Sequence, residues 1–316
     1  MHILILGAAG MIGRKLTAAI TAGALPATRL TLVDVVMPSP APGATTLALN
    51  LTDPAAPARL LKDRPDLIFH LAAVVSGEAE ADFAKGYATN LDASRALFDA
   101  IAAIPDYHPK LVFASSLAVY GAPFPPVIPD DFHLTPRSSY GTQKAMTELL
   151  ITDYSRRGFF DGIAIRLPTI CIRPGSPNRA ASGFYSSILR EPLAGLPATL
   201  PVRDTLRHWF ASPRAATRYF LRAASLTPVE IGPDRALTMP GLSASVAEMI
   251  EALRRVAGQK AVDLITLAPD PAIAAIVEPW AEAFEATRAR ALGFQAEQTF
   301  DEIIRIHLED TPPTRT

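Results

Sequence analysis

The chain has 316 residues, of which 49% are hydrophobic, and its 30 basic and 31 acidic residues give a formal net charge of −1. This balance excludes a strongly basic surface, so we expect no nucleic acid and no anionic membrane as a partner. The single cysteine, Cys171, excludes an internal disulfide framework and suits a reducing compartment. The apolar run 3–6 is too short for a signal peptide, and no stretch reaches transmembrane length. We therefore expect a soluble, cytoplasmic protein.

The first half of the chain alternates strand-like and helix-like segments. Continuous apolar runs predict buried parallel strands, and apolar residues three and four apart predict helices. The expected strands cover 2–6, 30–36, 47–51, 67–73, 110–115 and 163–170, and the expected helices cover 11–22, 54–62, 81–104 (with a break near Gly86) and 140–157. These repeated units predict an α/β fold with a doubly wound, Rossmann-type parallel sheet covered on both faces.

After Pro174 the alternation fades. Ser212 and Pro213 are a typical helix start, and Ser245 with Glu248 predicts a capping box for a helix over 245–256 that ends at Gly258. Further helices are expected over 182–189, 280–292 and 300–308, and a strand over 262–267. We expect a first domain of residues 1–171 and a smaller, mixed C-terminal domain of residues 172–316 that is partly interleaved with it.

A glycine-rich turn follows the first strand. Gly7, Gly10 and Gly13 suit three separate tasks, namely a tight turn, close approach of the backbone to a pyrophosphate, and close packing of the next helix. The free N–H groups of that helix would then face the phosphates. The spacing is Gly-x-x-Gly-x-x-Gly rather than Gly-x-Gly-x-x-Gly, and an ordinary tight turn is the alternative. The strand before it and the helix after it favour a dinucleotide site.

Asp34 ends the second expected strand, 21 positions after Gly13. A carboxylate at this place accepts hydrogen bonds from an adenosine ribose, although a solvated loop carboxylate is the alternative. Val35 and Val36 follow, with no basic side chain to neutralise a 2′-phosphate. The cofactor predicted from these residues is NAD rather than NADP.

Ser116, Tyr140 and Lys144 are the candidate catalytic residues. Tyr140 and Lys144 are four apart, so they share one face of the expected helix. A free tyrosine is a poor base at neutral pH, but a neighbouring ammonium and a nicotinamide cation both favour the phenolate. Ser116 ends a strand at the carboxyl edge of the sheet, where its hydroxyl could hold the reacting oxygen. A surface Tyr–Lys pair is the alternative.

Taken in order, these motifs resemble the extended short-chain dehydrogenase/reductase superfamily over the first 170 residues. The carrying residues are Gly7, Gly10, Gly13, Asp34, the segment 70–73, Asn90, the segment 115–121, Tyr140 and Lys144. The resemblance implies catalysis by Ser116, Tyr140 and Lys144. It also implies NAD contacts at Gly7, Gly10, Met11, Ile12, Asp34, Asn50, Leu51, Leu71, Ala72, Ala73, Asn90, Tyr140, Lys144, Pro168 and Ile170. Asn50 stands where members often have an aspartate.

Within that superfamily the chain is most similar to the D-erythronate dehydrogenases. The segments that carry this resemblance are 33–38, 72–80, 139–144, 153–159, 166–170, 173–178 and 180–184. It implies NAD-dependent oxidation of the C2 hydroxyl of a four-carbon sugar acid to the 2-oxo acid. It also implies the family's usual homodimer, formed through the helices near 86–104 and 140–157.

A sugar-acid substrate calls for cationic or hydrogen-bonding groups around its carboxylate. Besides Ser116 and Tyr140, we expect Ser76, Arg173 and Asn178 to contact the substrate, mainly from the second domain. In the alternative, Arg173 pairs with an acidic neighbour and the other two cap turns. The six histidines and the acids show no metal-ligand spacing, so no metal is expected.

Two other functions remain open at this point. Nucleotide-sugar epimerases and dehydratases share the motif set but retain and regenerate NAD, and a cofactor-sensing binding protein could keep a relic site. The intact Ser116, Tyr140 and Lys144 argue against the relic. Release of NADH would separate a dehydrogenase from an epimerase.

Overall fold

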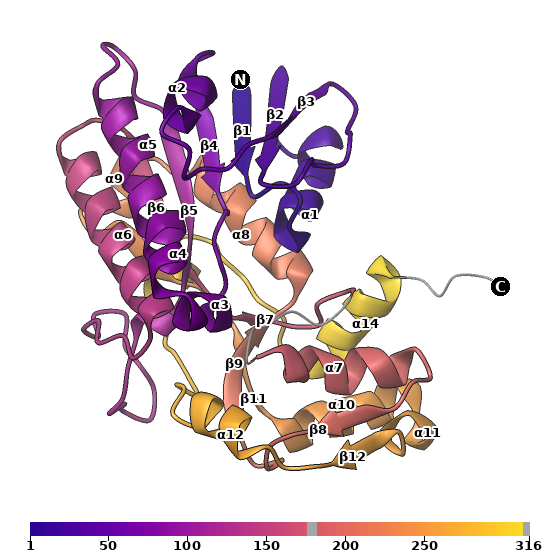
Figure 1. Ribbon diagram of the computed structural model, residues 1–316. Coiled ribbons are helices and arrows are strands. Elements are labelled where there is room, and N and C mark those ends of the chain that lie inside the picture. Colours follow the sequence, from indigo (N-terminus) through magenta and orange to yellow (C-terminus); the bar gives the residue numbers. More distant parts are fainter. Residues whose placement is uncertain (176–181, 312–316) are drawn as a thin grey trace.

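The computed structural model describes residues 1–175 and 182–311, and its largest element is a seven-stranded sheet (Figure 1). The strands are β1 His2–Leu6, β2 Arg29–Asp34, β3 Ala44–Ala48, β4 Leu67–His70, β5 Lys110–Ser116, β6 Asp161–Leu167 and β10 Ala236–Thr238. They pair in parallel in the order β10-β6-β5-β4-β1-β2-β3. The chain leaves β1 toward β2 and later restarts at β4 on the other side. This reversal places a switch point at the carboxyl ends of β1 and β4.

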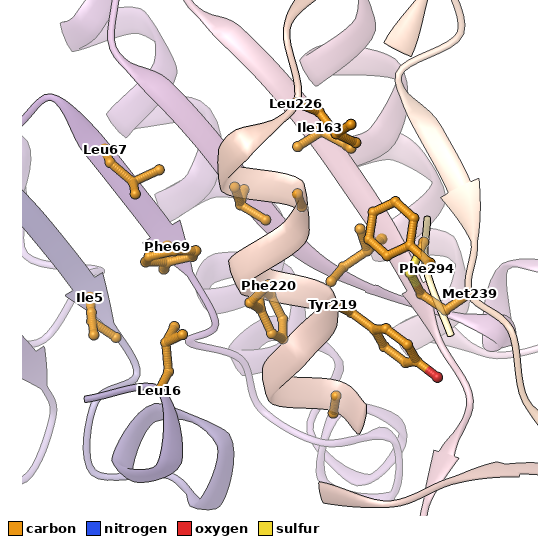
Figure 2. Packing of buried hydrophobic residues seen from close by; sticks show 14 of the residues in the cluster. Ile5, Leu16, Leu67, Phe69, Ile163, Tyr219, Phe220, Leu226, Met239 and Phe294 are labelled. Atoms are coloured by element: carbon orange, nitrogen blue, oxygen red, sulfur yellow. The ribbon is translucent and has the colours of Figure 1, made fainter. Parts of the chain in front are cut away.

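Helices cover both faces of the sheet, and strand residues alternate between them. Ile3, Ile5 and Phe69 pack with α1 (Met11–Thr21) and α8 (Pro213–Ser225). Figure 2 shows Phe220 of α8 beside Phe69, with Leu16 of α1 near Ile5. The neighbouring residues Leu4, Leu6 and Ile68 face a second cluster with α2 (Ala56–Leu61) and α5 (Ala93–Ala102). This period of two is the pleat of a sheet buried on both sides, and the predicted fold class is confirmed.

The segment 81–104, which we expected to be a long helix with a break near Gly86, is instead divided at Asp82 and over 88–92. It is preceded by α3 (Ser76–Ala81) and consists of α4 (Phe83–Tyr87), a π-helical segment η1 (Ala88–Asp92) and α5. Asp82 ends α3 and caps α4 by accepting a hydrogen bond from Lys85 N–H. The spacing of apolar residues correctly predicted helical structure here. It did not predict the cap at Asp82 or the π-helical turn, because neither changes the periodic pattern of the sequence in a simple way.

The expected strand 163–170 is two strands. β6 ends at Leu167, and after Pro168 a short β7 (Thr169–Ile170) joins a different sheet. Proline has no N–H to donate to a ladder, which fits the change of partner at this position. The expected helix 280–292 is wrong except for α13 (Thr287–Ala291), because Phe284 bridges Ile128 and packs in a buried cluster.

The rest of the chain after Pro174 forms mixed structure around its own core. Its strands are β8 Ala198–Leu200, β9 Arg207–Ala211, β11 Leu242–Ser245 and β12 Ile265–Leu267, and its remaining helices are α7 Gly183–Leu193, α9 Pro228–Ile231, α10 Val246–Ala257, α11 Gln259–Val262, α12 Pro271–Val277 and α14 Phe300–Asp310. A three-stranded sheet has the order β11-β9-β7, with β11 antiparallel and β7 parallel to β9, and β12 pairs with β8. Two further elements precede Pro174, namely the 3-10 turn η2 Leu117–Val119 and α6 Ser139–Arg156. Figure 1 shows this part below the carboxyl edge of the large sheet, while α8 and β10 return to that sheet.

The predicted helix caps are confirmed. Ser212 accepts a hydrogen bond from Ala215 N–H at the start of α8, and Ser245 and Glu248 form a reciprocal capping box on α10. Gly258 ends α10 at a φ of 84°. Among the described helices, none combines the length and apolar character needed to cross a membrane.

Candidate active site

The three glycines of the first turn occupy three different environments. Gly7 has a φ of +89°, and a Cβ there would lie 2.7 Å from Ala72 N. A Cβ on Gly13 would lie 2.3 Å from the Gly7 carbonyl oxygen, so Gly13 allows α1 to pack on the turn. Gly10, the N-cap of α1, is exposed, and a Cβ there would meet only the Gly7 oxygen at 3.3 Å. The open side of Gly10 leaves room for a phosphate beside free helix N–H groups, which fits a dinucleotide.

Asp34 lies at the carboxyl end of β2 beside this turn. Its carboxylate accepts hydrogen bonds from Ala9 N–H at 2.9 Å and from Val35 N–H at 2.7 Å. These bonds fix the side chain next to the glycine turn and leave acceptor capacity for ribose hydroxyls. The three residues after Asp34 are Val35, Val36 and Met37, which are 67%, 59% and 62% exposed. No cationic side chain therefore follows Asp34 directly. The surroundings of Asp34 suit NAD.

Met11 and Ile12, the other candidate contacts in this turn, form the first two positions of α1 and are partly buried. Their backbone therefore lies where a helix N-terminus meets a pyrophosphate. Asn50 and Leu51 follow β3. Asn50 is exposed and caps a turn by accepting a hydrogen bond from Thr52 N–H at 3.1 Å, and Leu51 packs against the cluster around α2 and α5.

The segment after β4 closes the turn from the other side. Leu71, Ala72 and Ala73 are partly buried, and Leu71 N–H donates to the Leu6 carbonyl oxygen at 2.8 Å. Asn90, in η1, accepts a hydrogen bond from Val74 N–H at 2.9 Å and donates to Val74 O at 3.2 Å.

Asn90 also donates to Gln143 Oε1 at 2.7 Å, and its side chain is buried. Both amide hydrogens of Asn90 are thus used within the protein. We infer that Asn90 positions the 73–75 backbone and ties it to α6 rather than offering its amide to a cofactor.

Ser116 and Tyr140 come together at the start of α6. Ser116 is the last residue of β5, and its hydroxyl is close enough to Tyr140 to lower the pKa of the phenol. Ser138 caps α6 by accepting a hydrogen bond from Gly141 N–H at 3.1 Å. A Cβ on Gly141 would lie 2.0 Å from Ala118 O, so glycine allows the helix start to approach the end of β5 this closely. The predicted Ser–Tyr juxtaposition is therefore present in the structure.

Lys144 lies one helical turn after Tyr140 and is buried. Its Nζ donates to Ala114 O at 2.8 Å and lies 4.4 Å from the centre of the Phe113 ring and 5.5 Å from that of Tyr140. Burial lowers the pKa of Lys144 to about 7, and the charge of Glu148 opposes this shift. The ammonium thus lies against the Tyr140 ring, and within residues 1–175 and 182–311 its hydrogen bond goes to the backbone.

Burial raises the pKa of Tyr140 to about 12, and the Ser116 hydrogen bond and the Arg173 charge act in the lowering direction. We expected Lys144 to favour the phenolate. In this structure the groups that favour it are Ser116 and Arg173. A cation that is bound beside Tyr140 would add to their effect.

Arg173 follows β7. Its Nε donates to Ile170 O at 3.0 Å and its Nη2 donates to Ser182 Oγ at 2.7 Å. Within residues 1–175 and 182–311, Arg173 forms no ion pair, so the alternative of an acidic partner is not met there. The Arg173 side chain is partly buried, and its charge lowers the pKa of Tyr140.

The other predicted positions are placed less closely. Ser76 is the first residue of α3 and is partly buried, Pro168 and Ile170 are buried where the chain passes between the two sheets, and Asn178 lies outside the described residues. Among the described residues no group of His, Cys, Asp and Glu could hold a metal ion.

Four buried polar residues near the site were not predicted from the sequence to be site residues. They are Ser115, Tyr120, Glu148 and Arg166. Glu148 stands four positions after Lys144 on the same helix face, and this spacing was the available signal.

Residues 3–210 match the NAD dependent epimerase/dehydratase family. The D-erythronate dehydrogenase of Cupriavidus necator is 46% identical over 98% of both chains. That of Haemophilus influenzae is 41% identical over 98% of this chain and 99% of its own. The crystal structure titled nucleoside-diphosphate-sugar epimerase, from Agrobacterium tumefaciens, is 57% identical with a TM-score of 0.95, over 98% of this chain and 94% of that one. L-threonine 3-dehydrogenase from Trypanosoma brucei has the same fold at 20% identity, with a TM-score of 0.86 over 98% and 97% of the chains.

The chain belongs to the NAD dependent epimerase/dehydratase family of extended short-chain dehydrogenases/reductases. The predicted superfamily, the use of NAD and the class of NAD-dependent oxidoreductase acting on a CH–OH group are confirmed. The predicted similarity to D-erythronate dehydrogenases is also confirmed, and it extends over nearly the whole chain.

Proposed function

We propose that this protein oxidises the C2 hydroxyl of D-erythronate, a four-carbon sugar acid, to the 2-oxo acid. The observation that carries the proposal is Arg173, a guanidinium without an ion-pair partner among the described residues, whose charge acts on Tyr140 from close by, as does the Ser116 hydroxyl. A hydroxyl on C2 is adjacent to the carboxylate. A substrate held at Arg173 by its carboxylate would therefore present this hydroxyl close to Tyr140.

The residues that would hold NAD are those around the glycine turn and the ends of β2 and β4. The backbone at Gly10, Met11 and Ile12 suits the pyrophosphate, and Asp34 suits the adenosine ribose. Lys144 is placed to serve the nicotinamide ribose. When bound, NAD supplies a hydride acceptor and a positive charge next to Tyr140.

Tyr140 is the proposed general base and acts through its phenolic oxygen. Ser116, whose hydroxyl lowers the pKa of Tyr140, can orient the substrate hydroxyl for proton transfer. Because burial holds the pKa of Tyr140 near 12, the base form becomes accessible only when cationic groups surround it. We therefore expect kcat/KM for oxidation to rise with pH as Tyr140 loses its proton, and to fall again above the pH at which Lys144 loses its own.

An epimerase remains the second candidate, favoured by the name of the 57% identical Agrobacterium structure. Epimerases of this family regenerate NAD within each turnover. NAD that stays bound through purification, with interconversion of nucleotide sugars and no NADH release, would support this candidate.

The experiment that tests the proposed substrate is a panel of four- to six-carbon aldonates and uronates, with NADH absorbance as the readout. D-Erythronate should show the highest kcat/KM, and its L-enantiomer and the matching neutral polyol should be poor substrates. Higher efficiency with a uronate would reassign the substrate while leaving the chemistry of Tyr140 intact.

We also propose a homodimer formed through the outer surfaces of α4–α6. Large apolar side chains are exposed there, with Leu149 at 66%, Phe83 at 62% and Met146 at 39% exposure. Light scattering should give twice the chain mass, and Leu149→Glu should give a monomer.

We also propose a division into domains of residues 1–171 and 172–316, in which α8 and β10 of the second domain return to the sheet of the first.

A further inference from the structure

A buried ion pair lies behind the proposed catalytic residues. Glu148, on α6, accepts hydrogen bonds from Arg166 Nε at 3.1 Å to each carboxylate oxygen and from Nη2 at 2.8 Å. It also accepts one from the Ser115 hydroxyl. The two charged side chains are 2% and 8% exposed. Such a pair needs every polar atom satisfied, and here the strands contribute those partners.

The network extends across the sheet. Arg166 is on β6, and its Nη1 donates to the Tyr120 hydroxyl at 2.6 Å, which is 2.8 Å from Thr238 Oγ1 on β10. Ser115 directly precedes Ser116 at the end of β5. Glu148 therefore connects α6, which carries Tyr140 and Lys144, to the strand end that carries Ser116.

Lys144 faces one acidic side chain and several that are neutral. The titratable groups around it are Tyr140 and Glu148 from α6 and His70 from β4. Arg173, which follows β7, acts on Tyr140. His70 is buried, and desolvation lowers its pKa to about 3, so it stays neutral. Of these groups only Glu148 is a carboxylate. Its charge opposes the desolvation that lowers the pKa of Lys144.

We propose that Glu148 is a positioning residue for this active site, because its carboxylate both fixes the Ser115–Ser116 strand end against α6 and supplies the negative charge that the buried Lys144 faces. The pair with Arg166 holds the carboxylate in place. This inference rests on the proposed function, because that function requires Lys144 to act beside Tyr140 as a charged ammonium.

The test is the pH dependence of kcat/KM in two variants, Glu148→Gln and the double variant Glu148→Gln with Arg166→Met. The single variant leaves Arg166 buried and unpaired, whereas the double variant removes both charges and preserves the fold more readily. In both variants, the pH at which Lys144 loses its proton should be about one unit lower than in the wild type. On the alkaline limb of the pH profile, kcat/KM should therefore be about tenfold lower than that of the wild type at the same pH. The affinity for NAD, measured by calorimetry over the same pH range, should decline from a correspondingly lower pH.

Glu297→Gln is the matched control. Glu297 is also a buried carboxylate, which accepts hydrogen bonds from Ser212 N–H and Oγ–H and pairs with Arg218 at 3.3 Å. It should lower the melting temperature without moving the pH profile.

A double variant whose pH profile and NAD affinity match the wild type would overturn the role of Glu148 and leave it as the partner of Arg166 alone. Full activity of Tyr140→Phe or Lys144→Met would instead overturn the proposed function. The two failures are therefore distinguishable.

Discussion

The cofactor side and the substrate side of the proposed site are built from different kinds of contact. Around NAD, the chain uses the consecutive units β1, α1 and β2, in which Gly13 packs on Gly7 and Asp34 accepts a hydrogen bond from Ala9 N–H. Around Arg173, the hydrogen-bond partners Ile170 and Ser182 are also near in sequence, but the preceding strand β7 pairs with the distant β9, which pairs with β11. Local contacts follow from local sequence rules, whereas long-range contacts depend on how the whole chain packs.

The first half could be predicted for this reason. The alternating buried strands, the glycine turn, Asp34 and the Tyr140–Lys144 spacing are patterns within single elements or adjacent ones. The structure has these elements in the predicted order, although β3 lies three residues before the strand expected over 47–51 and β4 ends three residues before the expected 73. The exceptions arise from tertiary contacts. The break at Pro168 moves Thr169 and Ile170 to another sheet, and the bridge from Phe284 to Ile128 replaces the helix expected near residue 284.

The candidate site divides in the same way. Ser116 and Tyr140 were expected to meet and do so, and Lys144 lies beneath the Tyr140 ring. The influence of Arg173 on Tyr140 could not be predicted, because it depends on the path of the chain after β7. The Glu148–Arg166 pair joins a helix to a strand and was likewise visible only in three dimensions.

The largest expected effect is that of Tyr140→Phe, which removes the proposed base and keeps the ring that packs over Lys144. We expect kcat to fall by roughly 10³–10⁴-fold, at the upper range of general base catalysis, with NAD affinity nearly unchanged. Steady-state kinetics and calorimetry measure the two quantities. A variant with normal kcat would show that the proton is taken elsewhere.

Arg173→Ala tests the substrate side. Loss of a charge-assisted hydrogen bond to a carboxylate should raise KM for the sugar acid by roughly 10- to 150-fold, while NAD affinity is retained. Arg173→Lys, which keeps the charge without the planar fork, should recover part of the loss. If KM is unchanged in Arg173→Ala, another group binds the carboxylate.

Gly13→Ala tests the cofactor side by comparison with Gly10→Ala. A Cβ at 2.3 Å from the Gly7 oxygen must displace backbone, so Gly13→Ala should destabilise the protein by roughly 1–3 kcal/mol. At Gly10 the nearest atom is 3.3 Å away, and the change should weaken NAD binding with little loss of stability. Urea unfolding and calorimetry measure both effects. Equal destabilisation in the two variants would contradict the separate roles assigned to these glycines.

The last expected effect concerns stability and pH. Lys144 has a pKa of about 7 in the folded protein against an ordinary value of 10.5, so between these values the unfolded chain binds more protons. The free energy of unfolding should therefore gain from this group as pH rises from about 7 toward 10.5, with a slope of at most about 1.4 kcal/mol per pH unit.

Lys144→Met should remove this contribution, which urea unfolding of the cofactor-free protein at several pH values would measure. His70 acts in the same direction at lower pH, between about 3 and 6.5, and serves as an internal reference that the Met variant retains. An identical pH slope in wild type and variant would mean that Lys144 is protonated throughout this range.

NADH formation by the purified protein, supplied with D-erythronate and free NAD, decides whether the protein is a D-erythronate dehydrogenase. We expect one NADH to be released for each 2-oxo acid formed, with turnover lost in Tyr140→Phe and KM raised in Arg173→Ala. No NADH from D-erythronate, or from any sugar acid, together with turnover of a nucleotide sugar on tightly held NAD, would contradict it.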